Sequence, residues 1–341
     1  MIGLLRELVA VPSFSREETA AADLLQLRLA DAGLAMHRTG NNLWCCTEGE
    51  GPTILMNAHI DTVRPNAGYT RDPFVATLEG DRLYGLGTND DGGSLVAMIE
   101  AYRILASRPQ PYRLVLSLTA EEEVTGTGGI EMLFPLLGPV DLGIIGEPTG
   151  MQMAVAERGL MVLDCTAHGV SGHAARNEGR NAIYEAMEDI LRLRALDFGC
   201  LSDTLGPVRA TVTMIEAGTQ HNVIPDTCRF VVDVRTNELF TNEEVLAMIS
   251  SCLRSDVRAR STRLGSSGIA PSHPAVLRGK ELELSAFGSP TLSNAAVCPF
   301  PTLKIGPGDS ARSHGPDEYI CLSEIREAID LYVKLLDGLK I

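Results

Sequence analysis

The stretch Tyr112–Glu123, which reads YRLVLSLTAEEE, decides the fold. Its first seven residues are mostly apolar, which predicts a strand buried on both faces. Three adjacent acids follow, and burying them costs free energy unless solvent, protons or metal ions compensate their charge. In open α/β sheets, ligands bind outside the carboxyl ends of the strands. The stretch therefore predicts an α/β sheet with a functional site at Glu121, Glu122 and Glu123.

The composition is that of an ordinary globular chain. Its 341 residues are enough for two domains, and 45% hydrophobic and 21% charged residues are typical of soluble proteins. A formal net charge of -15 argues against nucleic acid or an anionic membrane as the main partner. The same acidity fits bound cations or simply an acidic surface, and charge alone does not choose between them.

The eight cysteines contain no Cys-x-x-Cys pair, and most of them lie inside apolar runs. This pattern predicts a reduced, cytoplasmic protein with buried thiols rather than a disulfide scaffold. The first residues lack a basic region followed by a long apolar core, so we expect no signal peptide. Because no run of 18 or more apolar residues occurs, we also expect no membrane span.

Two patterns of elements alternate along the chain. Residues 1–157 and 265–341 pair helices with apolar strands, which predicts one doubly wound, mostly parallel α/β catalytic domain in two pieces. Helices are expected at 128–137 and 274–287 among others. Residues 158–264 read as strand-helix-strand-strand-helix-strand, a split βαβ or ferredoxin-like α+β domain inserted into the first.

Polar side chains follow several of the predicted strands. They are His59, Asp61, Asp90, Glu122, Glu123, Glu147 and His314. Each alone could be a solvated loop residue or a helix cap, but a doubly wound sheet brings strand ends together. A dinucleotide loop and a phosphate loop are both excluded, because the third glycine and the Lys-Ser/Thr pair are missing.

The set of histidines and carboxylates suits a hydrolytic site with two zinc ions. Asp90, Glu123 and Glu147 supply three negative charges, and a metal-bridging hydroxide supplies a fourth against four positive charges. Glu122 is then left free as a base.

The chain resembles the family of co-catalytic zinc deacylases and exopeptidases that includes acetylornithine deacetylase, succinyl-diaminopimelate desuccinylase and carboxypeptidase G2. The resemblance covers essentially the whole chain. It rests on His59-Ile60-Asp61, Gly85-x-Gly87-Thr88-x-Asp90, Glu122-Glu123, Gly146-Glu147-Pro148-Thr149, Gly169-x-x-Gly172-His173-Ala174, Asn222-Val223-Ile224-Pro225 and Ser313-His314. The pattern Gly306–Tyr319 is closer to acetylornithine deacetylase than to the desuccinylase.

The resemblance implies a pair of Zn²⁺ ions per subunit, with Co²⁺ able to substitute. His59 and Glu147 would bind one ion, Glu123 and His314 the other, and Asp90 would bridge them.

The resemblance also implies the catalytic roles. Glu122 would be the general base, which takes a proton from the bridging water and returns it to the leaving amine. Asp61 would orient the ring of His59. The family's bridging aspartate precedes a cis non-proline bond, so Asp90-Asp91 is expected to be cis.

The inserted domain resembles the family's lid and dimerisation domain. His173 would act in trans across a homodimer, where it would stabilise the tetrahedral oxyanion in the partner's active site. Asn222 and Arg235 would hold the carboxylate of the substrate. The alternative for Arg235 is a simple ion pair with Asp233.

The expected function is hydrolysis of an N-acetyl- or N-succinyl-ornithine or -citrulline in arginine biosynthesis. The alternatives are a succinyl-diaminopimelate desuccinylase, a related dipeptidase or carboxypeptidase, and a non-catalytic dimer that binds amino-acid derivatives. A common lysine of the family is replaced at Gly92, and Glu121 stands where Asp is more usual. A succinyl group would need another cation, and the sequence does not place one.

Overall fold

The structure is a computed structural model that describes residues 2–176 and 178–341. It divides into two compact units. The first runs to Val155 and includes Gly268–Phe287 and Ser293–Ile341, and the second is Ala156–Ser267 with Gly288–Leu292. The insertion therefore extends a few residues beyond the predicted 158–264 on each side, and the short segment Gly288–Leu292 also belongs to it.

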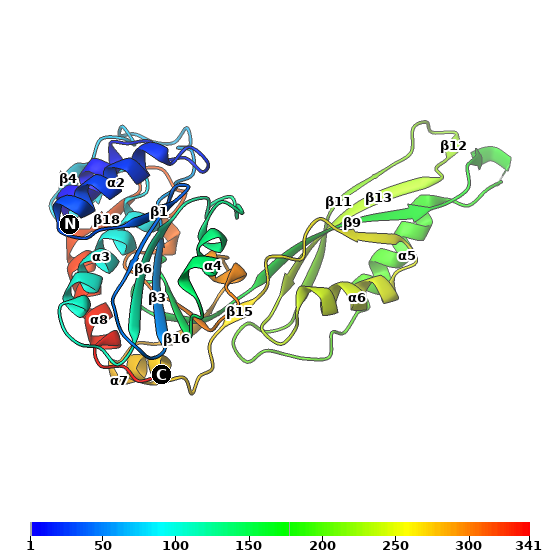
Figure 1. The fold of residues 1–341 in the computed structure, drawn as a ribbon. Helices are drawn as coiled ribbons and strands as arrows, with labels where there is room; N and C mark the ends of the chain where they lie inside the picture. Colours follow the sequence, from blue (N-terminus) through cyan, green and yellow to red (C-terminus); the bar gives the residue numbers. More distant parts are fainter. Residues whose placement is uncertain (1, 177) are drawn as a thin grey trace. The chain divides into compact units, whose positions relative to one another are not determined.

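A twisted sheet forms the centre of the first unit (Figure 1). Its strands follow the order β1-β2-β6-β3-β7-β17-β8, after which the path continues to β15 (Ser267–Gly268), and β16 (Ala286–Ser289) also pairs with β8. The first seven strands make up most of the sheet. They are β1 (His37–Thr39), β2 (Asn42–Cys46), β3 (Thr53–His59), β6 (Arg113–Thr119), β7 (Leu142–Ile145), β8 (Met153–Glu157) and β17 (Thr302–Lys304). The central strands β6, β3, β7 and β17 pair in parallel, whereas β1, β2 and β8 pair antiparallel with their neighbours. The predicted α/β fold class is thus confirmed.

Apolar residues of the central strands alternate between two cores. Ile54 and Met56 of β3 pack in the larger cluster, which also holds the helices. Those helices are α1 (Ile2–Val9), α2 (Thr19–Asp31), α3 (Gly93–Ala106), α7 (Pro274–Glu281) and α8 (Leu322–Leu336). Leu55 points the other way, into a smaller cluster around η2 (Ile130–Leu133) and α4 (Phe134–Leu137). The two faces explain why these strands read as continuous apolar runs.

Two predicted helices of this unit are shorter than expected. The helix expected at 128–137 is a 3₁₀ turn followed by the one-turn helix α4, where Pro135 supplies no backbone N–H. The helix expected at 274–287 ends at Glu281, and β16 (Ala286–Ser289) follows. Glu283 has a φ of 62°, a left-handed conformation that no α-helix continues through.

Short strands complete the first unit. β4 (Thr77–Glu79), β5 (Arg82–Tyr84) and β18 (Tyr319–Cys321) form a small sheet in the order β18-β5-β4. The remaining elements are η1 (Thr88–Gly92), η4 (Asn294–Val297), η5 (Ser310–Arg312) and β15 (Ser267–Gly268), which lies at the junction of the units.

The second unit is an antiparallel sheet with two helices. Its elements are β9 (Gly159–His168), α5 (Ala182–Ala195), β11 (Arg209–Ala217), β13 (Thr227–Thr236), α6 (Asn242–Cys252) and β14 (Asp256–Ala259), and the strand order is β11-β13-β9-β14. This order and connectivity are those of the predicted split βαβ sandwich. Residues of both helices share one core with alternate residues of the strands. A capping box from Thr241 to Glu244 begins α6.

A two-stranded extension belongs to the same unit. β10 (Gly172–His173) pairs with β12 (Val223–Ile224), and the 3₁₀ turn η3 (Ala174–Arg176) follows β10.

Two expectations about the environment of the chain can be compared with the structure. Among the described residues, no helix has the length and apolar character that a membrane crossing requires. All eight cysteines lie in the described part of the chain and are free thiols. Cys45, Cys165 and Cys228 are buried, but Cys200 is exposed, so the expectation of buried thiols holds only in part.

Candidate active site

His59, at the end of β3, stands at the centre of a group of carboxylates. Its Nε2 lies 3.0 Å from Oδ1 of Asp90. The other oxygen of Asp90, Oδ2, lies 3.7 Å from Nε2 of His314, and that nitrogen is 2.9 Å from Oε2 of Glu123. Asp90 thus has one oxygen toward each histidine. Four of the residues expected to bind metal therefore converge, although they come from four separate parts of the chain.

The Asp90-Asp91 peptide bond is cis, as predicted. Asp90 itself has the non-helical angles φ -122° and ψ 96° within η1.

Asp61 is completely buried and holds the chain around the site. Its carboxylate accepts hydrogen bonds from the hydroxyl of Ser15 at 2.7 Å and from the backbone N–H groups of Glu122 and Glu123 at 3.0 and 3.1 Å. Nδ1 of His59 lies 2.8 Å from the backbone carbonyl of Asp61 and 3.5 Å from its carboxylate. The main-chain oxygen is therefore the nearer partner of the ring, and the carboxylate also positions the two glutamates.

Glu122 and Glu147 also lie near His59. Nε2 of His59 is 4.0 Å from Oε2 of Glu122, and these residues form a group with Glu147 in which potential ligand atoms lie within 4.8 Å of one another. His59, Asp90 and Glu123 form a second such group. Glu122 thus lies as close to His59 as a metal ligand would. The sequence-based interpretation, in which Glu122 is a free base and not a ligand, does not predict this.

Burial changes the protonation of these groups in the metal-free protein. Burial raises the pKa of Glu122 to about 8 and that of Glu147 well above its usual value. Burial would lower the pKa of His59, but hydrogen bonds to Asp61 and Asp90 raise it instead. The hydrogen bond to Glu123 raises the pKa of His314 to about 9. The carboxylates are thus more numerous than the cations near them, and the site favours added positive charge.

These residues fit a pair of divalent metal ions. Imidazole and carboxylate are suitable ligands for zinc and related metals. The division of Asp90 between two histidines is the arrangement that a bridging carboxylate needs.

Lys304 was not recognised in the sequence as a site residue. It is the last residue of β17 and is only 4% exposed. Its Nζ lies 3.9 Å from Oε2 of Glu147. The signal was weak, because a single lysine in a three-residue strand reads as an edge residue rather than as a buried cation.

Glu318 was also missed, although the sequence pattern contains it. It is 3% exposed and accepts backbone hydrogen bonds from Gly87, Asn89 and Asp90 at 3.1, 2.8 and 2.9 Å. Burial nevertheless raises its pKa to about 7. Glu318 therefore fixes the backbone of the loop that carries Asp90.

Glu121, whose role the sequence left open, points away from the metal candidates. It has a φ of 57°, and its Oε2 accepts a hydrogen bond from the N–H of Gly128 at 3.3 Å. A Cβ added to Gly126 would lie 1.9 Å from the same oxygen, and one added to Gly128 would lie 2.1 Å from Oε1. Its carboxylate thus occupies space that is open only because residues 126 and 128 are glycines. It contacts the loop that follows the glutamates and stabilises the conformation of that loop.

A buried amide network supports the strand ends. The side-chain nitrogen of Asn57 donates to Ser117 and Thr119, each at 2.9 Å, and Asn294 donates to Oδ1 of Asn57 at 2.9 Å. These bonds join β3, β6 and η4 directly beneath His59, so they fix the spacing of the strands that carry the site.

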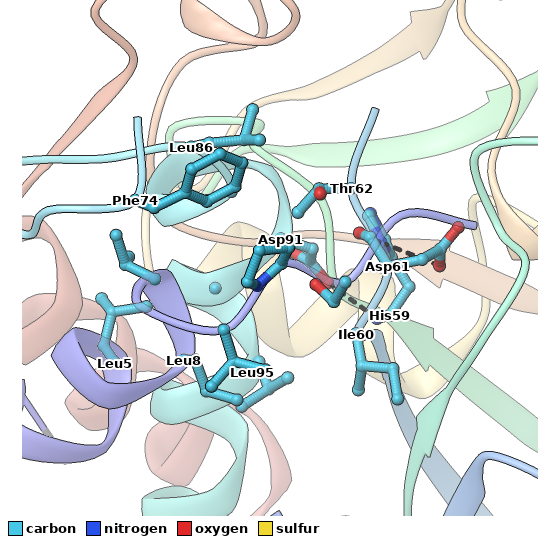
Figure 2. Close-up of a pocket in the computed structure, with 16 residues that line it drawn as sticks. Leu5, Leu8, His59, Ile60, Asp61, Thr62, Phe74, Leu86, Asp91 and Leu95 are labelled. Carbon is cyan, nitrogen blue, oxygen red and sulfur yellow. Dashed lines mark hydrogen bonds and ion pairs between the residues drawn. The ribbon is translucent and has the colours of Figure 1, made fainter. Parts of the chain in front are cut away.

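A small pocket lies behind His59 (Figure 2). Apolar side chains, among them Leu5, Leu8 and Phe74, line it together with Asp61 and Asp91. Its volume of about 30 Å³ suits a water molecule rather than a substrate. Burial raises the pKa of Asp91 to about 7, and Oδ1 of Asp91 has no hydrogen-bond partner within residues 2–176 and 178–341.

The three remaining candidates lie in the second unit. His173 and Asn222 are exposed neighbours, since the N–H of Ala174 donates to the carbonyl of Asn222 at 3.0 Å. Arg235 lies near the other end of β13 and donates to Asp233 at 2.9 and 3.2 Å. Within one chain the structure therefore keeps Arg235 apart from Asn222, and it shows the simple ion pair that was the alternative for Arg235.

Comparison with known families matches both units. Residues 155–260 match the peptidase dimerisation domain, and residues 42–138 match peptidase family M28. The second match contains His59, Asp90, Glu122 and Glu123.

Similar proteins are named as deacylases and peptidases. Succinyl-diaminopimelate desuccinylase of Dinoroseobacter shibae is 30% identical over 269 residues, which cover 73% of this chain and 71% of that protein. Acetylornithine deacetylase of Pectobacterium carotovorum is 28% identical over 98% of this chain and 96% of its own length. An aminopeptidase of Bacillus cereus has the same fold, with a TM-score of 0.79 at 21% identity over 98% of this chain and 96% of that one. An M20 family metallo-carboxypeptidase of Sulfolobus solfataricus gives a TM-score of 0.73 at 17% identity over 99% and 98%.

Proposed function

Since this chain belongs to the M20 peptidase family of metal-dependent amide hydrolases, we propose that it removes the acyl group from an N-acyl-L-amino acid. One observation carries the proposal. The ends of β3, β6 and β7 and the loops with Asp90 and His314 bring two histidines and four carboxylates together within the first unit. His314 is exposed, but the side chains of the four carboxylates are only 8–11% exposed. These carboxylates need cations, and a hydrolase of this family would bind metal there.

We assign two Zn²⁺ ions per subunit to this cluster, with Co²⁺ as a substitute. His59 and Glu147 would bind one ion, and Glu123 and His314 would bind the other. Asp90 would bind both ions. Bound zinc polarises a carbonyl group and lowers the pKa of water, which suits attack on an amide.

Glu122 is the residue we assign to proton transfer. Its carboxylate lies 4.0 Å from His59, and burial raises its pKa to about 8 when no metal is bound. A base with a pKa near the working pH can accept a proton from the attacking water and return it to the leaving amine. Asp61 holds the N–H of Glu122 at 3.0 Å and therefore positions this carboxylate.

His173 is the residue we assign to the oxyanion, supplied by the partner subunit of a homodimer. His173 is exposed in the two-stranded extension of the second unit, so it is accessible to a second copy of the chain.

Apolar exposure in the second unit supports a dimer. Tyr184, Met187 and Leu191 form one exposed stripe of α5, at 66%, 52% and 58% exposure. Met214 and Ile215 are exposed on β11, the edge strand of the sheet. An edge strand and an apolar helix stripe are the features that association covers.

The substrate we propose is an N-acetyl- or N-succinyl-ornithine or -citrulline, a substrate of arginine biosynthesis. Arg235 would hold its carboxylate, with Asp233 keeping the guanidinium of Arg235 in place. Asn222, which lies apart from Arg235 within one chain, would contact the same carboxylate only if the partner subunit supplied it. Relatives named for acetylornithine and for succinyl-diaminopimelate are similar to this chain at nearly equal identity, so a desuccinylase or a dipeptidase is the second candidate.

A substrate comparison tests the proposal. The zinc-loaded protein is assayed with acetylornithine, succinylornithine, acetylcitrulline, succinylcitrulline, succinyl-diaminopimelate and a dipeptide, and kcat/KM is measured for each. We expect the highest value for an ornithine or citrulline derivative. Highest activity on succinyl-diaminopimelate or the dipeptide would establish the second candidate. Absence of both bound zinc and hydrolysis would instead identify a non-catalytic binding protein.

A further inference from the structure

Two arginines face each other on the outer side of the sheet in the second unit. Arg209 of β11 and Arg235 of β13 are direct cross-strand partners. Val232 and Val234 of β13 are buried in the core with the helices, so Arg235 points to the opposite face. Because cross-strand partners share a face, with Cβ atoms about 4.5–5.5 Å apart, Arg209 points the same way.

The charges on this face do not balance. Asp233 binds Arg235 at 2.9 and 3.2 Å, but the side chain of Arg209 has no hydrogen bond or ion pair with any described residue. Like charges directly opposite each other on a sheet are destabilising. In a chain of net charge -15, a pair of facing arginines with a single bound carboxylate is a local exception.

A third cation lies behind this pair. Arg158 is 9% exposed and donates to the backbone carbonyls of Pro207, at 2.9 Å, and Leu205. Burial lowers its pKa, and the charges of Arg209 and Arg235 lower it further, whereas the charge of Glu238 raises it. Its N–H groups are thus directed at the backbone, but its charge adds to the positive potential of the Arg209–Arg235 pair.

We propose that Arg209 and Arg235 together form a carboxylate-binding site that selects substrates with a second carboxylate, N-succinyl over N-acetyl derivatives. The inference rests on the proposed function, in which Arg235 holds the α-carboxylate common to both classes. Guanidinium groups bind carboxylates through paired hydrogen bonds, and an adjacent guanidinium without a partner suits one more carboxylate. Arg209 is thus the cation that a succinyl group requires.

The test is the ratio of kcat/KM for N-succinyl-L-ornithine to that for N-acetyl-L-ornithine. In R209Q we expect this ratio to fall by about 10- to 100-fold, the usual effect of a charged hydrogen bond, through the succinyl substrate alone. R209K keeps the charge and should retain part of the preference. R235Q should lower kcat/KM for both substrates alike. An unchanged ratio in R209Q, or an equal fall for both substrates, overturns the inference.

A binding measurement separates this inference from the proposed function. If the wild-type protein hydrolyses neither compound, the proposed function fails, and calorimetric titration of the metal-free protein with both compounds still tests the site. We then expect the succinyl compound to bind wild type more tightly than R209Q, with a difference that shrinks at high salt. Equal affinity of the two proteins overturns the inference. Circular dichroism and the unfolding temperature of each variant show that it is folded.

Discussion

Apart from His314, which is exposed, the two units place their candidate residues in different environments. In the first unit, His59, Asp61 and Asp90 are at most 9% exposed and are held by bonds to one another and to the backbone. In the second unit, His173 and Asn222 are exposed, and Arg235 is partly exposed beside Asp233. The residues of the first unit converge within one chain, whereas those of the second unit are accessible from outside it. The comparison indicates that changes in the first unit act on chemistry and metal, and changes in the second on the substrate and the partner subunit.

The largest effect is expected at Glu122. Glu122→Ala removes the proposed base, so kcat should fall by about 10²–10⁴-fold, the usual contribution of general acid–base catalysis. Glu122 also lies in a possible ligand group with His59 and Glu147, so metal content decides its role. If the variant retains both metals but loses turnover, Glu122 is a base. Loss of one metal, measured by elemental analysis, identifies a ligand and contradicts the assignment.

The next effect is expected at His173. His173→Ala removes the proposed oxyanion donor, and kcat should fall by about 10²–10³-fold with metal content unchanged. Mixing Glu122→Ala and His173→Ala subunits separates action in trans from action in cis. Mixed dimers should regain activity, because one of their two sites then has both groups intact. No recovery in dimers shown to be mixed would mean that His173 serves its own chain.

A smaller effect is expected at Lys304, inside the first unit. Its buried ammonium group lies 3.9 Å from Glu147, so it repels a metal ion held by that carboxylate. Lys304→Met should tighten metal binding by about tenfold, within the range of a partly screened charge interaction, while Lys304→Arg should leave it nearly unchanged. Competition with a chelator measures the affinity. Weaker binding by the methionine variant would show that Lys304 instead holds Glu147 in the position the metal needs.

The smallest effect is expected from pH on the metal-free protein. Burial raises the pKa of Glu122 to about 8 and those of Asp91 and Glu318 to about 7. The folded state therefore binds more protons than the unfolded state, and stability present below about pH 4.5 should be lost as the pH rises to about 8. The unfolding temperature of metal-free protein should decline across this range. Zinc should remove the decline, and a rising unfolding temperature without metal would contradict the pKa shifts.

The sequence predicted the polar residues that directly follow apolar strands. An apolar run and the polar residue after it form a local pattern that can be recognised without the fold. His59 and Glu147 are examples, since each follows a run that reads as buried on both faces. Lys304 could not be predicted in the same way, because its burial depends on the neighbouring strands and not on its own. Glu318 appeared in the motif, but its three backbone hydrogen bonds depend on a loop more than two hundred residues away in the sequence.

Local backbone geometry explains the other differences. The helix expected to reach residue 287 ends early, and Glu283 has a positive φ that its amino-acid type does not signal. Glu121 was grouped with its neighbours by charge alone, yet its own positive φ turns it toward Gly126 and Gly128. Arg209 reads as an ordinary exposed strand residue until the pairing of β11 with β13 places it opposite Arg235.

The hydrogen bonds by which Glu318 fixes the loop of Asp90 have a consequence for the synthesis of the protein itself. Most of the proposed metal ligands leave the ribosome within the first 147 residues, but His314 and Glu318 follow only after the whole inserted unit has been made. Until then the loop of Asp90 lacks the carboxylate that orders it, and the cluster lacks one imidazole. We expect a nascent chain stopped before residue 314 to acquire zinc poorly, so that metal loading comes at the end of synthesis and a truncated chain remains without a completed centre.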